Sequence, residues 1–525
     1  MRQDGAFFVQ TNIERSAMSQ EQKKAKRQAA PELSLSEQQA IRIQHLRALE
    51  EQGLNPYGKK FIRTKNAAFI KDKYKDLAPE EESEEEVSLA GRITAWRGHG
   101  KASFIDLTDL SDRIQLYFKY DVLGEESYKR LSLADLGDLI TVKGVVFRTS
   151  RGELSVRVKE WSIAAKSLIP PPEKFHGLTD VEVRYRQRYA DLIANKEVRE
   201  VFIKRSHIIA AIRRHLDSMG FLEVETPCMS AVAGGAAARP FITHHNALNV
   251  DMYLRIATEL HLKRCIVGGL EKVYEIGRLF RNEGIDTKHN PEFTTIELYE
   301  AWSDCEGMMK ITEGIIDTCC NEVLHTHNVT FMGHELDLRP PYPRLTMDSL
   351  FQKYAGISIK ELREPGRAKE KALELGINLG NKEHTLAQLF DKIFEVTCEE
   401  HLIQPTFVTE QPVELSPLAK RKEDDPTLTD RFELFVCGSE LANAFSEVND
   451  PFDQRKRFEE QQALKGIDDE AHPLDEDFLN ALMYGMPPTG GLGIGIDRLV
   501  MLLTGQNCIR DVLLFPTMKP LDSDK

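Results

Sequence analysis

Alternating apolar and polar positions mark one long stretch of the chain, from Val87 to residue 163. A period of two is typical of half-buried β-strands. The predicted strands span residues 87–97, 101–107, 113–119, 139–148 and 153–163. A polar stretch at 124–137 predicts one helix between the third and fourth strands. Five short strands with a helix at that point are typical of the OB-fold, a small β-barrel.

The segments on either side of these strands set the domain limits. Residues 36–52 have apolar residues at roughly helical spacing, and an acidic run at 79–86 predicts a solvated linker or loop. Three consecutive prolines at 170–172 predict a stiff linker between two domains. We therefore expect a disordered extension at 1–36, a helical lead-in and OB-fold at 37–168, and a second domain at 169–525.

Helices and strands are mixed in the second domain, which predicts an α+β fold. Apolar residues between Val198 and Leu216 recur at helical spacing, and Gly220 is suited to end that helix. A short strand at 221–224 follows. Residues 343–430 carry more helical pattern between charged loops, and we expect them to form an insertion between catalytic elements.

The pattern at 272–299 predicts a β-hairpin whose polar loop runs from Arg281 to Asn290. Side chains alternate between the faces of a strand, so Phe293, Glu297 and Tyr299 share one face, and Arg281 has the parity to reach the same space. An aromatic ring, a carboxylate, a phenol and a cation together suit a binding site. A half-exposed strand with polar residues in water is the simpler alternative.

A glycine-rich strand at 490–495 predicts a flat surface. Gly491, Gly493 and Gly495 share one face and remove every Cβ from it, so a flat group can lie against the backbone. A helix follows, with Arg498 on its first turn. Glycine-rich strands are common, so this motif alone is weak.

Two further segments bring carboxylates. Asn443, Phe445 and Glu447 share a strand face, whereas Glu440 needs a bulge, or a start just inside the turn at 438–439, to join them. A helix would instead align 440, 443 and 447. Carboxylates beside a polyphosphate suit Mg²⁺. An ordinary pair of acidic residues on the surface explains the pattern equally well. Glu259 follows Thr258 at the start of an apolar helical stretch, where an acid is ordinary.

Composition excludes several classes of protein. The net charge of −14 means that any contact with nucleic acid must use a local patch. The eight cysteines form no CxxC pair, which argues against a zinc knuckle and favours reduced thiols in the cytoplasm. The sequence has no run of 18 apolar residues and no apolar leader at its start, so we expect no membrane association.

Taken together, these segments resemble the three signature motifs of class II aminoacyl-tRNA synthetases. Residues 220–227 resemble motif 1, residues 280–299 motif 2, and residues 491–498 motif 3. An N-terminal OB-fold is typical of the subclass that contains the lysine, aspartate and asparagine enzymes. The resemblance is closest to the lysyl type and covers roughly residues 37–520. Near-verbatim phrases occur at 174–178, 184–189, 239–246 and 281–284.

The resemblance implies a fold and a reaction. The fold is an antiparallel catalytic sheet flanked by helices and preceded by a five-stranded OB-fold barrel, in a homodimer formed through the motif 1 region. The reaction activates L-lysine with ATP to lysyl-adenylate and pyrophosphate, then transfers lysine to the 3′ end of tRNA(Lys). A buried ammonium needs acidic partners, whereas an aspartate substrate needs an arginine, and the segment 440–447 contains none. Aspartyl or asparaginyl specificity, an inactive tRNA-binding paralogue and a paralogue that ligates lysine to a protein are the alternatives.

The resemblance also implies residue roles. Arg281 is the expected catalytic residue, at the α-phosphate. The expected ATP-binding residues are Arg281, Glu283, His289, Asn290, Phe293, Glu440, Gly491, Gly493, Gly495 and Arg498. The expected lysine-binding residues are Gly235, Glu259, Glu297, Tyr299, Asn443, Phe445 and Glu447. Mg²⁺ is expected on Glu440 and Glu447. The expected anticodon-binding residues are Arg97, Phe104 and Gln115, unless Phe104 belongs to the barrel core.

Overall fold

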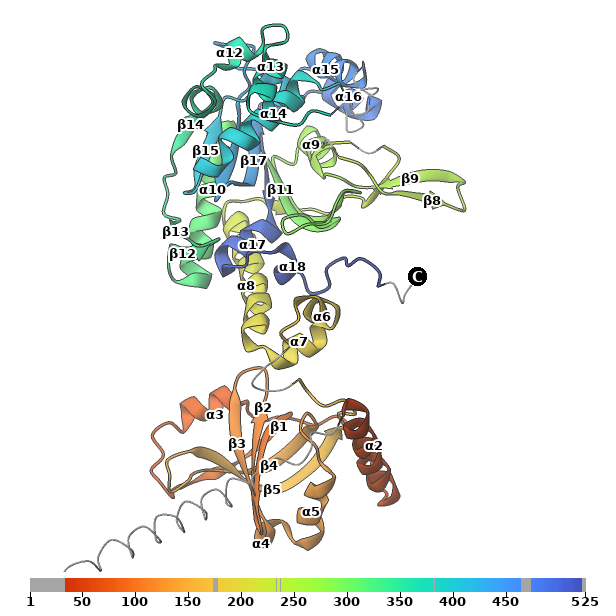
Figure 1. Cartoon of the computed structure of the whole chain (residues 1–525), viewed down its shortest axis with the longest axis vertical. Helices are drawn as coiled ribbons and strands as arrows, with labels where there is room; N and C mark the ends of the chain where they lie inside the picture. Colours follow the sequence, from red (N-terminus) through yellow and green to blue (C-terminus); the bar gives the residue numbers. More distant parts are fainter. Residues whose placement is uncertain are drawn as a thin grey trace, which may run out of the picture. The chain divides into compact units, whose positions relative to one another are not determined.

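The computed structural model describes residues 34–172, 178–232, 234–236, 238–380, 383–463 and 474–521. Most of the predicted extension at 1–36 therefore lies outside the described residues. The chain divides into two compact units, Met1–His176 and Gly177–Lys525, which are described in turn (Figure 1). No helix in the described part of the chain is long and apolar enough to cross a membrane.

The N-terminal unit contains a closed barrel with the strand order β1-β2-β3-β5-β4, which confirms the predicted OB-fold. Its strands are β1 (Glu82–His99), β2 (Ala102–Thr108), β3 (Arg113–Lys119), β4 (Leu139–Arg148) and β5 (Leu154–Ala165). The barrel core comes from the alternating apolar positions, among them Ile93, Ile105 and Val156, which are fully buried. Periodicity therefore predicted the position of each strand.

Two expectations for this unit were wrong. The single helix expected at 124–137 is replaced by α4 (Tyr120–Leu123), α5 (Glu125–Lys129) and the 3-10 turn η1 (Arg130–Leu133). Gly124, at the start of the expected helix, separates α4 from α5; the expected helix is cut short because Ala134 is extended and Gly137 has a φ of 96°, which no helix interior adopts. The acidic run at 79–86 is largely strand, because β1 begins at Glu82 and pairs with β4. Glu82 and Glu86 lie 2.7 and 3.3 Å from Arg157 and Lys159, which offsets their mutual repulsion.

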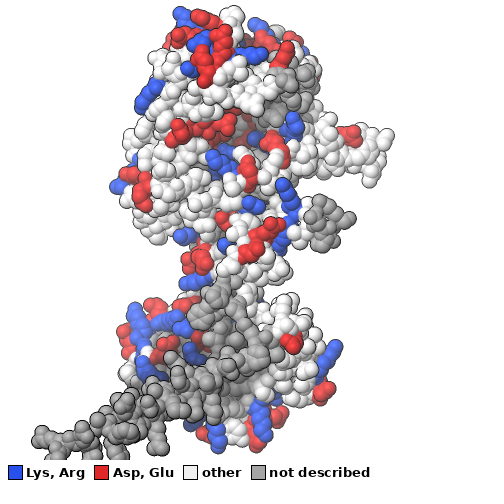
Figure 2. Space-filling view, viewed as in Figure 1, with Lys and Arg blue, Asp and Glu red and all other residues white. Residues whose placement is uncertain are grey.

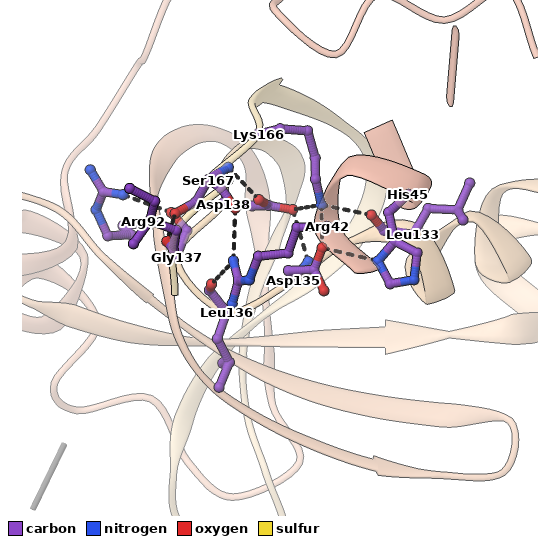
Figure 3. Close-up of polar contacts among 11 residues, drawn as sticks. Arg42, His45, Arg92, Leu133, Asp135, Leu136, Gly137, Asp138, Lys166 and Ser167 are labelled. Carbon is purple, nitrogen blue, oxygen red and sulfur yellow. Dashed lines mark hydrogen bonds and ion pairs between the residues drawn. The ribbon is translucent and has the colours of Figure 1, made fainter. Parts of the chain in front are cut away.

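The predicted lead-in helix, α2 (Leu35–Glu51), docks on the barrel through a buried polar cluster (Figure 3). A second helix, α3 (Ala67–Lys73), covers another part of the barrel. Lys166 Nζ lies 2.6 Å from Asp135 and 2.7 Å from Asp138. From α2, His45 Nδ1 lies 3.0 Å from the Asp135 carboxylate, and Arg42 donates to the backbone carbonyls of Leu136 and Ser167. Each buried charge is thus paired, as burial requires. The helix is an integral part of the unit.

The C-terminal unit is built on an eight-stranded sheet with the order β14-β15-β16-β17-β18-β11-β10-β6. The strands from β15 to β10 pair antiparallel, and the two outer pairs are parallel. The strands are β6 (Leu222–Glu223), β10 (Lys272–Phe280), β11 (Glu292–Ala301), β14 (Arg344–Thr346), β15 (Thr406–Thr409), β16 (Arg431–Val436), β17 (Ser439–Ser446) and β18 (Thr489–Gly495). The predicted antiparallel catalytic sheet is confirmed.

Helices cover the two faces of this sheet unequally. On one face, α8 (Lys196–Ser218), α10 (Cys305–Cys319) and α17 (Ile496–Thr504) form the main core with Ile296 and Leu298 of β11. On the other face, α9 (Glu259–Val267) and α16 (Glu476–Met483) pack with Val273 and Tyr299 in a smaller cluster, next to α15 (Pro451–Ala463). Among the described residues, the helices packed against β18 belong to the main core, and its glycines face a cavity on the second face.

The remaining elements surround this framework. The three-stranded sheet β7-β9-β8 comprises Met229–Ser230, Val250–Leu254 and Ile242–His245, and the hairpin β12-β13 comprises Asn328–Phe331 and His334–Asp337. Short helices are α6 (Val181–Arg186), α7 (Arg188–Ala194) and α18 (Ile509–Val512). The region 343–430 contains α11 (Met347–Leu350), α12 (Ile359–Leu362), α13 (Arg367–Glu374) and α14 (Leu386–Thr397). It also supplies β14 and β15 to the sheet, so it is less separate from the catalytic elements than expected.

Acidic and basic side chains are interspersed on the face of the molecule seen in Figure 2. This mixed surface agrees with the net charge of −14, which excludes a uniformly positive molecule. A polyanionic partner must therefore be recognised by local groups.

Candidate active site

A cavity of about 580 Å³ opens on the second face of the C-terminal sheet. Its walls come from the β10–β11 hairpin and its loop, from β17 and β18, and from the starts of α9 and α14. Every residue predicted to bind ATP or lysine lines this cavity, except Glu447. Segments more than 200 residues apart in the sequence therefore meet in one space, while the role of each residue in it stays a prediction.

The glycines of β18 form the centre of the cavity floor. Gly493 pairs with Glu297 of β11 on one side and with Asn443 of β17 on the other. Gly491 pairs in the same way with Tyr299 and Phe445. A Cβ added at Gly491 would lie 2.6 Å from Tyr299 Cε1 and would overlap the Glu447 carboxylate. The glycines thus provide a flat surface, and Gly491 also lets polar side chains approach the backbone closely.

One end of the cavity carries cationic and aromatic groups. The Arg281 guanidinium lies 5.3 Å from the centre of the Phe293 ring, and its Nε has no hydrogen-bond partner among the described residues. Arg498 donates to the backbone carbonyl of Glu440 at 2.6 Å, and its Nη2 lies 3.2 Å from His289 Nε2. This end can stack on a flat ring and bind an anion.

The motif 2 loop is held from behind by the last part of the chain. Ile509 donates its backbone N–H to the carbonyl of Thr287 at 2.8 Å, and Thr517 donates to Asn290 Oδ1 at 3.2 Å. Asn290 also donates to the carbonyl of Glu292 at 2.6 Å. Asn290 is largely buried, so the structure gives it a loop-holding function beside its predicted contact with the nucleotide.

The other end of the cavity is acidic. Glu259, Glu297 and Glu447 are all buried, and Tyr299 lies among them. Burial, followed by the charge of Glu259, raises the pKa of Glu297 to about 7, although the Thr258 N–H donates to it at 3.2 Å. Burial also raises the pKa of Tyr299, which keeps the phenol neutral and able to donate. This end suits a cation, because a buried cation needs acidic partners to offset the cost of its desolvation.

Glu447 is not among the residues that line the cavity, but its carboxylate lies against the side of Gly491 where a Cβ would be. Its carboxylate is ion-paired with Lys263 of α9, which also donates to Glu259 Oε1 at 2.5 Å. Sequence reasoning missed Lys263. Its position four residues after Glu259, in an otherwise apolar stretch, was the available signal. The opposite charges around it raise the pKa of Lys263 against the effect of burial, so it is a cation.

Acidic residues near Glu440 were also missed. Glu433 and Asp391 line the cavity beside it. Burial raises the pKa of Glu433 to about 7; Arg431, 2.5 Å away, opposes this effect and Glu440 adds to it. The pairing of β16 with β17 skips Leu441, which confirms the predicted bulge. The bulge brings Glu440 to the same cavity as Asn443 despite their opposite parity.

In the OB-fold, the predicted anticodon-binding residues lie on neighbouring strands. Arg97 pairs with Phe104 in the register of β1 and β2, and Gln115 lies on β3. Phe104 stacks on Tyr117 with ring centres 4.8 Å apart and is not part of the buried barrel core. The alternative of a core role for Phe104 is thereby disfavoured, and an aromatic platform is available on the barrel surface.

Comparison with known proteins agrees with this geometry. Residues 180–519 match the family model of class II tRNA synthetases (D, K and N), and residues 87–164 match that of the OB-fold nucleic acid binding domain. The lysine–tRNA ligase of Moorella thermoacetica is 55% identical over 482 residues, covering 92% of this chain and 97% of the relative. That of Halalkalibacterium halodurans is 54% identical over 496 residues, covering 94% and 99%. The chain belongs to the lysine–tRNA ligase family of class II tRNA synthetases.

Proposed function

We propose that the chain activates L-lysine with ATP and transfers it to tRNA(Lys). The observation that carries this proposal is the polarity of this cavity. Buried carboxylates and a neutral phenol lie at one end, and Arg281, Phe293 and Arg498 lie at the other. The acidic end matches the side-chain ammonium of lysine, and the cationic aromatic end matches a nucleotide. An aspartate side chain would be repelled by the same carboxylates.

The first step needs no general base, because the lysine carboxylate is already a nucleophile. It attacks the α-phosphorus of ATP, a carboxyl–phosphate anhydride bond forms, and the bond to the β-phosphate breaks as pyrophosphate leaves. In this proposal Arg281 stabilises the charge that builds up on the α-phosphate, and Phe293 and Arg498 hold the adenine between them. The protein contributes position and charge stabilisation. Transfer to the terminal adenosine of the tRNA then releases AMP.

For Mg²⁺ we propose Glu440 together with Glu433. Both line the cavity, and Glu440 contributes to the raised pKa of Glu433, so the two carboxylates repel each other until a cation lies near them. Mg²⁺ prefers one or two carboxylates completed by phosphate oxygens, and it would neutralise the charge of the ATP phosphates. Glu447 fits this role less well than expected, because Lys263 is already its partner.

The test of the proposed function is ATP–pyrophosphate exchange with each of the twenty amino acids. Lysine alone should drive exchange, because only its side chain places an ammonium among the buried carboxylates. Exchange with aspartate or asparagine would support the sibling specificities. A folded protein that exchanges with no amino acid would support the inactive tRNA-binding paralogue.

We predict that Phe104→Ala weakens tRNA charging and spares lysyl-adenylate formation. Stacking of one base on an aromatic ring contributes about 1–3 kcal/mol, so KM for tRNA should rise about 10-fold or more. Aminoacylation of tRNA and exchange without tRNA are the two measurements. Tyr120→Ala is the matched control, because its ring packs on Tyr128 next to the α4–α5 helices. Equal losses in both reactions of Phe104→Ala would contradict the assignment.

The assembly and the location of the enzyme are proposals as well. We propose a homodimer through the motif 1 region, since Ile203 of α8 and Leu222 of β6 are exposed apolar side chains there. The β8–β9 hairpin adds Ile242 and Val250. We also propose a cytoplasmic location, because the substrates of translation are found there and the described cysteines are free.

A further inference from the structure

Lys263 is a buried lysine for which the proposed chemistry has no role. Its side chain has no exposed surface, and its Nζ lies between the carboxylates of Glu259, on the same helix, and Glu447, which follows β17. The rings of Phe445 and Phe478 lie 5.5 and 5.9 Å from Nζ. Lysine is almost never fully buried unless it is paired, because removing an ammonium from water is costly. The site is therefore built around this charge.

Glu447 is the carboxylate most affected by this arrangement. Its Oε2 is ion-paired with Lys263, while its Oε1 has no hydrogen-bond partner among the described residues and lies against Gly491. Tyr299 lies against the same glycine. Burial raises the pKa of Glu447. Lys263 opposes this effect, whereas the charges of Glu259 and Glu297 add to it. Lys263 thus favours an ionised Glu447 with one acceptor oxygen left over.

We propose that Lys263 is a positioning residue for the substrate, fixing Glu259 and Glu447 so that their remaining oxygens bind the side-chain ammonium of lysine. The inference rests on the proposed function, since it requires the lysine side chain to enter the acidic end. Three carboxylates without Lys263 would repel one another and take up protons, and a protonated carboxyl group no longer pairs with an ammonium. With Lys263 present, Glu259 and Glu447 stay ionised, and the three carboxylates still attract one more cation.

The charged and titratable groups around Lys263 come from each element packed against it. They are Glu259 on α9, Glu297 and Tyr299 on β11, and Glu447 after β17. From α16, Phe478 faces Lys263, whereas Asp475 and Asp477 are paired with Arg264 at 3.1 and 3.0 Å. The substrate ammonium would join a set of three carboxylates, one phenol and one ammonium.

The test uses the full-length variants Lys263→Met and Lys263→Gln in lysine-dependent exchange, with KM for lysine and for ATP measured between about pH 6 and 8.5. KM for lysine should rise at least about 10-fold at pH 7, and KM for ATP should stay within about 3-fold. The rise should shrink as pH increases, because carboxyl groups with a raised pKa ionise at higher pH. Lys272→Met is the matched control: Lys272 pairs with Glu300 at 2.7 Å and lies 5.5 Å from the Phe221 ring, outside the cavity.

Two results would overturn the inference. The first is a folded variant whose KM for lysine stays within about 3-fold of wild type, or rises together with KM for ATP at every pH. The second is measured on the wild type and needs no variant to fold. If Lys263 keeps Glu259 and Glu447 ionised, as proposed, only the Glu297 carboxyl group, whose pKa burial raises to about 7, should gain a proton as the pH falls. Log KM for lysine should therefore rise by no more than about 1 for each pH unit below pH 7. A slope near −2 would mean that Glu447 titrates as well. Wild-type protein without lysine-dependent exchange would refute the proposed function instead.

Discussion

Replacing Arg281 with alanine is expected to lower the rate of lysine-dependent ATP–pyrophosphate exchange by about 10²–10³-fold or more. Arg281 is the cation of motif 2 that lies over Phe293 in the cavity, with one guanidinium nitrogen still without a partner among the described residues. The reaction has no general base, so the charge that develops on the α-phosphate must be stabilised by such groups. The loss should therefore appear mainly in kcat.

Arg278→Ala is the matched control for Arg281→Ala. Arg278 lies on the same strand, β10, but it is exposed, 3.7 Å from Glu292, and does not line the cavity. Its removal should leave exchange close to the wild-type rate. Exchange by Arg281→Ala within about 3-fold of wild type would show that another group stabilises the transition state, and Arg281 would lose its assignment.

Replacing Gly491 with alanine is expected to raise KM for lysine by about 100-fold. The added methyl would lie 2.6 Å from Tyr299 Cε1 and would overlap the Glu447 carboxylate, so both groups must move. A displacement of about 1 Å in a positioned group is enough for an effect of this size. Steady-state kinetics of exchange measure the change, and thermal unfolding shows whether the sheet is intact.

Gly493→Ala provides the comparison, because its added methyl meets no atom closer than 3.8 Å. KM for lysine should change far less there, although contact between the methyl and the adenine could raise KM for ATP. Similar values of KM for lysine in the two variants would mean that Glu447 and Tyr299 are not held against the floor at Gly491.

The sequence predicted most of the fold because its signals were local. Alternation located the barrel strands and the β10–β11 hairpin, and glycine spacing located the floor of the cavity. The secondary-structure predictions were wrong where a sequence pattern had two possible interpretations. A run of glutamates suggested a linker, but Arg157 and Lys159 on the neighbouring β5 neutralise it and allow a strand. The helix expected at 124–137 is cut short where Ala134 becomes extended and Gly137 has a positive φ, because a glycine's φ depends on its surroundings.

The residues of the candidate site also divide into those that a local pattern could identify and those that only the fold brings together. Side chains on one strand face, such as Glu297 and Tyr299, could be grouped by parity alone, while their individual roles came from family resemblance. Lys263 was missed although its spacing from Glu259 was a local signal, because its other partner, Glu447, is 184 residues further along the chain and only the folded sheet brings the two together. Glu433 was missed because its proximity to Glu440 depends on the pairing of β16 with β17.

The hydrogen bonds from Ile509 and Thr517 to the motif 2 loop have a practical consequence. Shortened versions that stop before residue 509 would lose the support of that loop, even though none of the removed residues is a predicted lysine-binding residue. Affinity handles, fluorophores and surface attachments are therefore better placed at the opposite end of the polypeptide. Any label fused directly after residue 525 calls for a parallel measurement on the untagged enzyme.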